Sequence, residues 1–151
     1  MQKLFSLSEK LFFNILFICL ASFIYFIFLP MNETTISIGM IFCVLYFGMN
    51  FYTGYKYNLK ITESIIVAII GCGVGLFLSV FALYAQLILH SPNIATWITM
   101  PYYIPTLSLA KLFSINITLA YTFYLMIINI LLVIIGACSR NIMNKFFSIY
   151  K

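Results

Sequence analysis

The sequence contains no aspartate, and only 7% of its 151 residues are charged, against about 25% in an average soluble domain. A compact soluble fold needs polar side chains over most of its surface, and this chain has too few of them. Hydrophobic residues make up 64% of the chain instead. These proportions exclude a soluble enzyme, a disordered tail and a nucleic-acid binder, and they indicate a protein whose outer surface faces lipid.

The shortage of ionisable residues also excludes the familiar intramembrane enzymes. Signal peptidase II needs two aspartates, rhomboid proteases need a GxSG serine with a buried histidine, and membrane metalloproteases need an HExxH motif. Quinone-linked thiol oxidases need CxxC pairs, lipid phosphotransferases need clustered acids for magnesium, and small multidrug exchangers need a carboxylate in mid-span. The acids here are only Glu9, Glu33 and Glu63, and His90 is the one histidine. We therefore expect no enzymatic activity, no catalytic residue and no cofactor.

The four cysteines are spread along apolar runs and form no CxxC pair. They are Cys19, Cys43, Cys72 and Cys138. A cysteine in such a run usually behaves as a small buried apolar residue. We expect neither a disulfide framework nor a metal site.

Four apolar runs are each long enough to cross a membrane as a helix, since about 17–20 residues span some 30 Å of hydrocarbon. They cover about Leu11–Leu29, Ile36–Thr53, Ser64–Leu89 and Ile117–Cys138. The first run is too long for a signal-peptide core and no cleavage pattern follows it, so we expect it to be retained. Alternating polar residues, typical of a membrane barrel, are missing. The predicted fold is a single all-α integral membrane domain with four transmembrane helices.

The segments between these runs differ sharply in positive charge. The two termini and the connection between the second and third runs carry Lys3, Lys10, Lys56, Lys60, Arg140, Lys145 and Lys151, whereas the other connections carry only Lys111. Lys and Arg are retained on the cytoplasmic side, so both termini are predicted to be cytoplasmic, and a dual topology is disfavoured. Heavy use of Ile, Phe, Tyr, Asn and Lys indicates an AT-rich bacterial genome, which suggests the bacterial inner membrane.

The long connection from His90 to about Asn116 lies on the predicted outer side. Trp97, Tyr102 and Tyr103 favour the headgroup level, where the ring is in an apolar layer and its polar tip is wet. The spacing within Thr106–Phe113 predicts a short helix on the outer leaflet, with a partly re-entrant hairpin as the alternative. His90 is expected to be a solvated cap, and a proton-sensitive group is the other possibility.

Small residues recur along one face of the third run. They are Ala68, Gly71, Gly75, Ser79 and Ala82. Such a face lets another backbone approach closely, which strengthens packing in lipid. The sequence leaves open whether it packs within the chain or against a second protein.

Polar residues inside the runs form a second pattern. Thr122, Asn129 and Gly136 recur every seven residues in the fourth run, and Asn129 lies near mid-span, where an amide needs a hydrogen-bond partner. The candidate partners are Gln86, Ser79 and Asn50. These residues either hold helices together or line a path for a polar solute.

Size, cytoplasmic termini, small loops and basic tails together resemble the immunity proteins that neutralise pore-forming colicins. The resemblance implies a non-enzymatic accessory or protective protein that binds another membrane protein through the small-residue face or the outer loop. The alternative is an oligomeric transporter or channel subunit, with Asn129, Gln86 and Asn50 along the route. A structural or regulatory protein without a ligand remains a third interpretation. The expected partners are the bilayer and another membrane protein or a second copy of the chain, and not nucleic acid.

Overall fold

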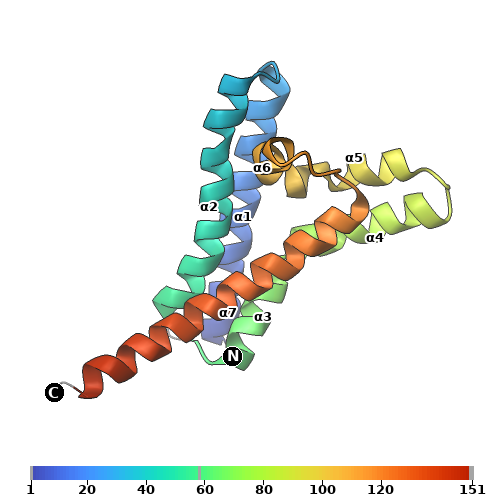
Figure 1. The fold of residues 1–151 in the computed structure, drawn as a ribbon. Helices are drawn as coiled ribbons and strands as arrows, with labels where there is room; N and C mark the ends of the chain where they lie inside the picture. Colours follow the sequence, from blue (N-terminus) through green and yellow to red (C-terminus); the bar gives the residue numbers. More distant parts are fainter. Residues whose placement is uncertain (1, 58, 150–151) are drawn as a thin grey trace.

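The computed structural model describes residues 2–57 and 59–149, and this part of the chain is almost entirely helical, with no strand in it. Its elements are α1 (Gln2–Phe28), α2 (Glu33–Tyr57), α3 (Ile61–Gly71), α4 (Gly73–Leu87), α5 (Pro92–Tyr103), a 3-10 turn η1 (Ile104–Thr106), α6 (Leu107–Leu112) and α7 (Leu119–Ile149). The predicted all-helical fold is confirmed. Figure 1 shows α1 and α2 side by side, with α7 crossing them obliquely.

Within the described residues, three helices are long and apolar enough to cross a membrane: α1, α2 and α7. The pair α3 and α4 gives a fourth candidate if the two are counted as one span, but they meet at an angle of 55°. Each of these three helices is longer than the apolar run that predicted it. For example, α1 starts at Gln2 and α7 continues past Arg140. The coarse prediction of an apolar helical bundle therefore holds.

The expectation of one unbroken third span over Ser64–Leu89 is wrong. The break lies at Cys72, which is flanked by Gly71 and Gly73, and glycine is a frequent site of helix kinks. Backbone hydrogen bonds continue across it, because Cys72 N–H donates to the carbonyl of Ala68 at 2.9 Å and Leu76 N–H donates to that of Cys72 at 3.0 Å. Both the N–H and the carbonyl of Cys72 therefore stay hydrogen-bonded at the bend.

The short helix expected over Thr106–Phe113 is present as α6, Leu107–Leu112, but the long connection after α4 contains more than this helix. It forms α5, which runs back along α4, and then η1 and α6, which pack against α2. Residues 102–108 are all buried. The segment therefore turns back into the bundle, as in the hairpin alternative, and the α4–α5 hairpin projects from one side (Figure 1).

The centre of the bundle is the crossing of α2 and α7, where two glycines bring the backbones into contact. A Cβ atom at Gly54 would overlap the carbonyl oxygen of Val133, and one at Gly136 would overlap the carbonyl oxygen of Phe51. Neither clash could be relieved by a side-chain movement, because the obstacle is backbone on both sides. The approach of these two helices therefore depends on both glycines.

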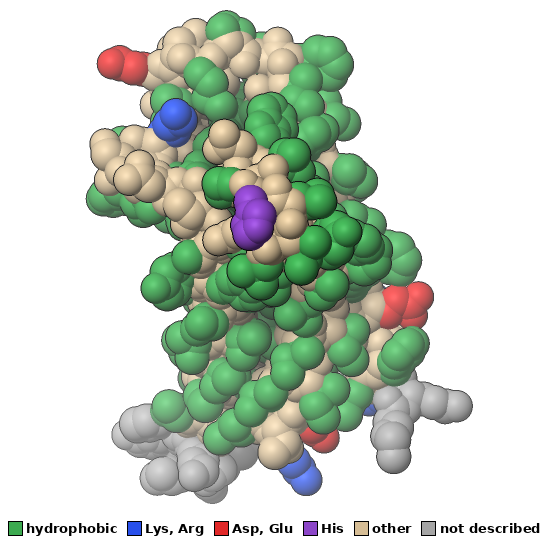
Figure 2. All heavy atoms as spheres, turned by 90° about the vertical axis from the view of Figure 1, so that its right-hand side faces the viewer, with side chains coloured by type: hydrophobic (Ala, Val, Ile, Leu, Met, Phe, Trp, Pro, Cys, Tyr) green, Lys and Arg blue, Asp and Glu red, His purple; other side chains and the backbone are tan. Residues whose placement is uncertain are grey.

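Charged side chains gather toward the two ends of the bundle. Lys3 and Lys10 of α1 and Glu63 of α3 line one hollow, and the guanidinium of Arg140 lies 5.4 Å from the ring centroid of Tyr55 near the end of α2. Lys111 lies on α6, whose Ser108 packs at Gly39. Gly39 is in the first half of α2, whereas Tyr55 is near the end of that helix. Figure 2 shows hydrophobic side chains over most of one face, with Lys or Arg toward its upper and lower ends. Among the described side chains, Lys3, Lys10 and Arg140 thus lie toward one end of the bundle and Lys111 lies toward the other.

A reporter fused to the C-terminus of the full chain tests the predicted orientation. Alkaline phosphatase is expected to be inactive there, because it needs disulfides that form only outside the cytoplasm. A green fluorescent protein at the same position is expected to be bright. An active phosphatase together with a dark fluorescent protein would contradict the orientation predicted from the positive charges.

Gly136→Ala is expected to lower the free energy of unfolding by about 1–3 kcal/mol, because the added methyl group meets the backbone of α2. Gly48→Ala is the matched control, since a Cβ at Gly48 has no neighbour within 4 Å and alanine favours a helix by about 0.5–1 kcal/mol. Circular dichroism during sodium dodecyl sulfate titration in mixed micelles measures both. Equal stability of the two variants would contradict the close crossing.

Candidate functional site

Four polar side chains meet in the interior of the bundle. The amide nitrogen of Asn129 on α7 donates to the hydroxyl oxygens of Tyr46 on α2, at 2.8 Å, and Tyr102 on α5, at 3.0 Å. The amide nitrogen of Asn50 on α2 donates to the side-chain oxygen of Asn129 at 3.1 Å and to the carbonyl of Tyr46 at 2.8 Å. All four residues have 0% exposure. We call this set the polar cluster.

The helices position the polar cluster through simple spacing. Tyr46 and Asn50 are one turn apart on α2, so both face α7. Tyr102 is held against α4 by Gly75, where a Cβ atom would lie 2.7 Å from Cε1 and Cζ of the tyrosine ring. The thiol of Cys19 on α1 lies 3.8 Å from the carbonyl oxygen of Tyr102. Helices α1, α2, α4 and α7 therefore all contact Tyr102.

The polar cluster is suited to holding helices together, because its members on α2, α5 and α7 bond to one another. Both N–H groups of the Asn129 amide donate to neighbours, and so does the amide nitrogen of Asn50. The side-chain oxygen of Asn50 is buried without a partner, as is the hydroxyl of Thr122, one helical repeat from Asn129. Of the partners proposed for Asn129, the structure brings Asn50 to it.

The small-residue face of the third run packs within the chain. Ala68, Gly71, Gly75, Ser79 and Ala82 are all buried. A Cβ at Gly71 would lie 2.6 Å from the Leu11 side chain of α1, and Gly75 contacts Tyr102. The hydroxyl of Ser79 is buried without a partner. This face is therefore covered by the chain's own helices.

The four residues expected at the outer interface separate into two groups. Tyr102 and Tyr103 are buried at 0% and 6% exposure, so the expectation that their polar tips are wet is wrong. They are buried because α5 turns inward, which brings Tyr102 to Asn129 and the Tyr103 ring 6.2 Å from that of Tyr121. Trp97 is 70% exposed, and His90 is exposed at the hairpin tip with a φ of 50°.

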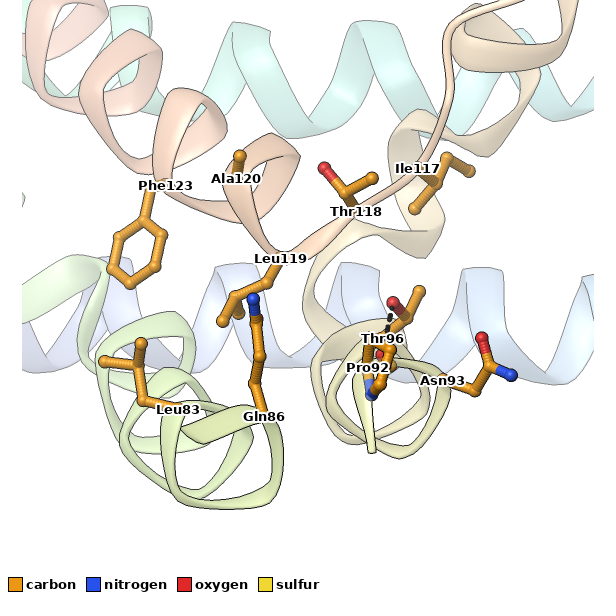
Figure 3. Close-up of a pocket in the computed structure, with 10 residues that line it drawn as sticks. All are labelled: Leu83, Gln86, Pro92, Asn93, Thr96, Ile117, Thr118, Leu119, Ala120 and Phe123. Atoms are coloured by element: carbon orange, nitrogen blue, oxygen red, sulfur yellow. Dashed lines mark hydrogen bonds between the residues drawn. The ribbon is translucent and has the colours of Figure 1, made fainter. Parts of the chain in front are cut away.

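Gln86 lies in a different place from the polar cluster. It lines an open cleft of about 540 Å³ between α4, α5 and the beginning of α7. Figure 3 shows its side chain extending from α4 toward the start of α7. The cleft is lined by Leu83, Gln86, Pro92, Asn93, Thr96, Ile117, Thr118, Leu119, Ala120 and Phe123. A second hollow of about 370 Å³ on α5 shares Asn93, Thr96 and Ile117 with it.

The polar lining of this cleft is only partly satisfied. The hydroxyl of Thr96 donates to the carbonyl of Pro92 at 3.1 Å, the bond drawn in Figure 3. Within the described part of the chain, the side-chain amides of Gln86 and Asn93 form no hydrogen bond. The cleft therefore combines apolar walls with amides that are free to bond to a visiting group.

Sequence reasoning missed Tyr46 and the close crossing at Gly54. A usable signal exists, because Tyr46, Asn50 and Gly54 follow at intervals of four and so share one face of α2. The four cysteines are free thiols, and the described residues contain no group of three or more His, Cys, Asp or Glu side chains that could hold a metal ion.

Comparison with protein families, curated proteins and solved structures finds no match to this chain. What the chain does therefore has to be inferred from its own residues.

Asn129→Leu is expected to lower the free energy of unfolding by about 1–3 kcal/mol, since it leaves two buried hydroxyls and the amide of Asn50 without their partner. Asn14→Leu is the matched control, because Asn14 is exposed on α1 and leucine suits a lipid-facing position. The detergent titration used for the glycine variants measures both. If Asn129→Leu is as stable as the unaltered chain, the polar cluster does not hold the bundle.

Proposed function

We propose that this chain is a non-enzymatic multi-pass membrane protein that acts by binding another membrane protein. In this proposal it is an accessory subunit or a protective factor of the immunity-protein kind. The contact site is the cleft between α4, α5 and the start of α7, and its occupant is a membrane-spanning helix of the partner.

The observation that carries the proposal is the presence of two side-chain amides without a hydrogen bond in a cleft whose other lining, apart from Thr96 and Thr118, is apolar. The outward face of α4 is apolar at Phe77, Val80 and Phe81, as suits lipid. Gln86 and Asn93 differ, because an amide in contact with hydrocarbon is unfavourable unless it is hydrogen-bonded. A partner helix can supply the missing groups with its own hydroxyl, amide or carbonyl, and interhelical hydrogen bonds of this kind stabilise association in membranes.

The geometry also changes where the partner is expected to bind. The small-residue face, with Gly71 and Gly75, is occupied by Leu11 and Tyr102 and is not free for a second protein. The cleft is open, and α5, which belongs to the long outer connection, forms one of its walls. Recognition through that connection is therefore the part of the sequence-based hypothesis that we keep.

The alternative function is transport through an oligomer. One observation favours it, since the same cleft could pair with that of a second copy and bring two sets of Gln86, Asn93 and Thr118 side chains together around a polar route. A route through a single chain along Asn50 and Asn129 is not supported, because both are fully buried and bonded to each other. Of the three residues predicted to line a route, Asn129, Gln86 and Asn50, only Gln86 lies in an open cleft.

Ala120→Trp tests the proposed contact by filling the cleft. Ala120 is exposed and lines the cleft, so the indole occupies the space meant for the partner helix without entering the core. Affinity purification from native membranes in mild detergent, with mass spectrometry, is expected to recover a stoichiometric membrane protein with the unaltered chain. Recovery should fall about tenfold or more with Ala120→Trp. Phe17→Trp is the control, because Phe17 is 73% exposed on α1, away from the cleft.

A photoreactive residue at Gln86 identifies what lies in the cleft. Crosslinking to the co-purified protein from Gln86, and not from Phe17, is expected. Crosslinks only to a second copy, with solute flux into proteoliposomes, would replace partner binding with transport. Undiminished recovery with Ala120→Trp would exclude the cleft as the contact site.

A further inference from the structure

A second, separate hollow lies where the beginning of α1, the end of α2 and the beginning of α3 meet. Its volume is about 440 Å³. It is lined by Lys3, Leu4, Ser6, Leu7, Lys10, Tyr57, Leu59 and Glu63. Three segments of the chain therefore contribute to one concave site, which shares no residue with the cleft at α4, α5 and α7.

The hollow carries a net positive charge, with Lys3 and Lys10 against the single carboxylate of Glu63. Lys3 and Lys10 are two helical turns apart, so they lie on one face of α1. Neither forms an ion pair with a carboxylate of the described residues. The one acid of the hollow, Glu63, accepts a hydrogen bond at its Oε2 from the backbone N–H of Lys60 at 2.9 Å and keeps its negative charge. An anion in the hollow would therefore meet two ammonium groups without ion-pair partners and one carboxylate.

The surroundings reinforce this charge. The ammonium of Lys56, next to Tyr57 at the end of α2, lies 5.2 Å from the ring centroid of Tyr52 and 5.6 Å from that of Tyr57. Lys60 precedes α3 and has an exposed side chain. With Lys3 and Lys10, these make four cations around one end of the bundle, against the two acids Glu9 and Glu63, so the net charge there is positive. Their combined electrostatic field favours a ligand that carries a full negative charge.

The hollow also has an apolar side that a simple ion would not use. Leu7 and Leu59 are buried at 6% and 5% exposure, and the exposed face of α3 beside them continues with Ile61, Ile65 and Ile66. The hydroxyl groups of Ser6 and Tyr57 add hydrogen-bond donors at the rim. A phosphate headgroup with acyl chains would use both the donors and cations of the hollow and the apolar side chains beside them.

We infer that this hollow binds the phosphodiester headgroup of an anionic phospholipid, with Lys3 and Lys10 contacting the phosphate and the acyl chains lying along α3. Basic pockets between helices at the cytoplasmic surface are suited to such headgroups, and each lysine near an anionic surface strengthens binding. The inference does not depend on the proposed partner, since it concerns another end of the molecule and a different chemical class of ligand.

The test uses the purified full chain and mass spectrometry under non-denaturing conditions, with phosphatidylglycerol or phosphatidylcholine added to the detergent. The unaltered chain should retain phosphatidylglycerol in preference. The double variant Lys3→Gln and Lys10→Gln should bind it on the order of tenfold more weakly. Lys111→Gln is the matched control, because it removes one exposed cation from outside the hollow.

A stability measurement keeps the test independent of any folding defect. Both lysines are exposed, so the double variant should unfold at the same temperature as the unaltered chain when no lipid is added. Phosphatidylglycerol should raise the unfolding temperature of the unaltered chain and of Lys111→Gln, and not that of the double variant. Equal retention of both lipids, or equal affinity in the double variant, would overturn the inference. Displacement of the lipid by millimolar inorganic phosphate would assign the hollow to a soluble phosphate compound instead.

Discussion

The amide of Asn129 joins parts of the chain that are far apart in sequence, and the arrangement of the other helices depends on it. It bonds to Tyr46 and Asn50 on α2 and to Tyr102 on α5. Lipid gives helices no hydrophobic reason to prefer one another, so packing and hydrogen bonds decide which arrangement forms. An amide that must find its partners selects one register of α7 against α2. It also fixes how deeply α5 enters the bundle.

On α2, the buried and exposed faces differ in a way opposite to that of a helix in a soluble domain. The buried face of α2 consists of small and polar residues, namely Thr35, Gly39, Cys43, Tyr46, Asn50, Thr53 and Gly54. The surface carries large apolar side chains, and glycines at 54, 75 and 136 allow close contacts inside. Against this background, outward-facing polar groups are exceptional. The cleft at Gln86 and the basic hollow at Lys3 and Lys10 are two such places, one uncharged and one cationic.

The sequence is a good guide where a property depends on one segment. Apolar run length predicts the helices, and the spacing of Thr122, Asn129 and Gly136 predicts the buried face of α7. It is a poor guide where a property depends on two segments. Glycines inside an apolar run are compatible with either a straight or a bent helix, so the bend at Cys72 has no unique local signal. Tyr102 is typical of an interface by its residue type and is buried only because its partner lies on α7. The cleft and the hollow each combine segments distant in sequence.

Three of the four cysteines are buried, and each lies in a different part of the helix packing. Cys19 is on α1 against α5, Cys43 is on the inner face of α2, and Cys72 is at the bend with its thiol 4.0 Å from the carbonyl oxygen of Met126 on α7. A thiol reagent can reach each one only when its own contact opens. The unaltered chain thus carries three built-in probes of local opening. Their relative rates of modification distinguish a bundle that opens as one unit from one in which the bent α3–α4 pair separates first.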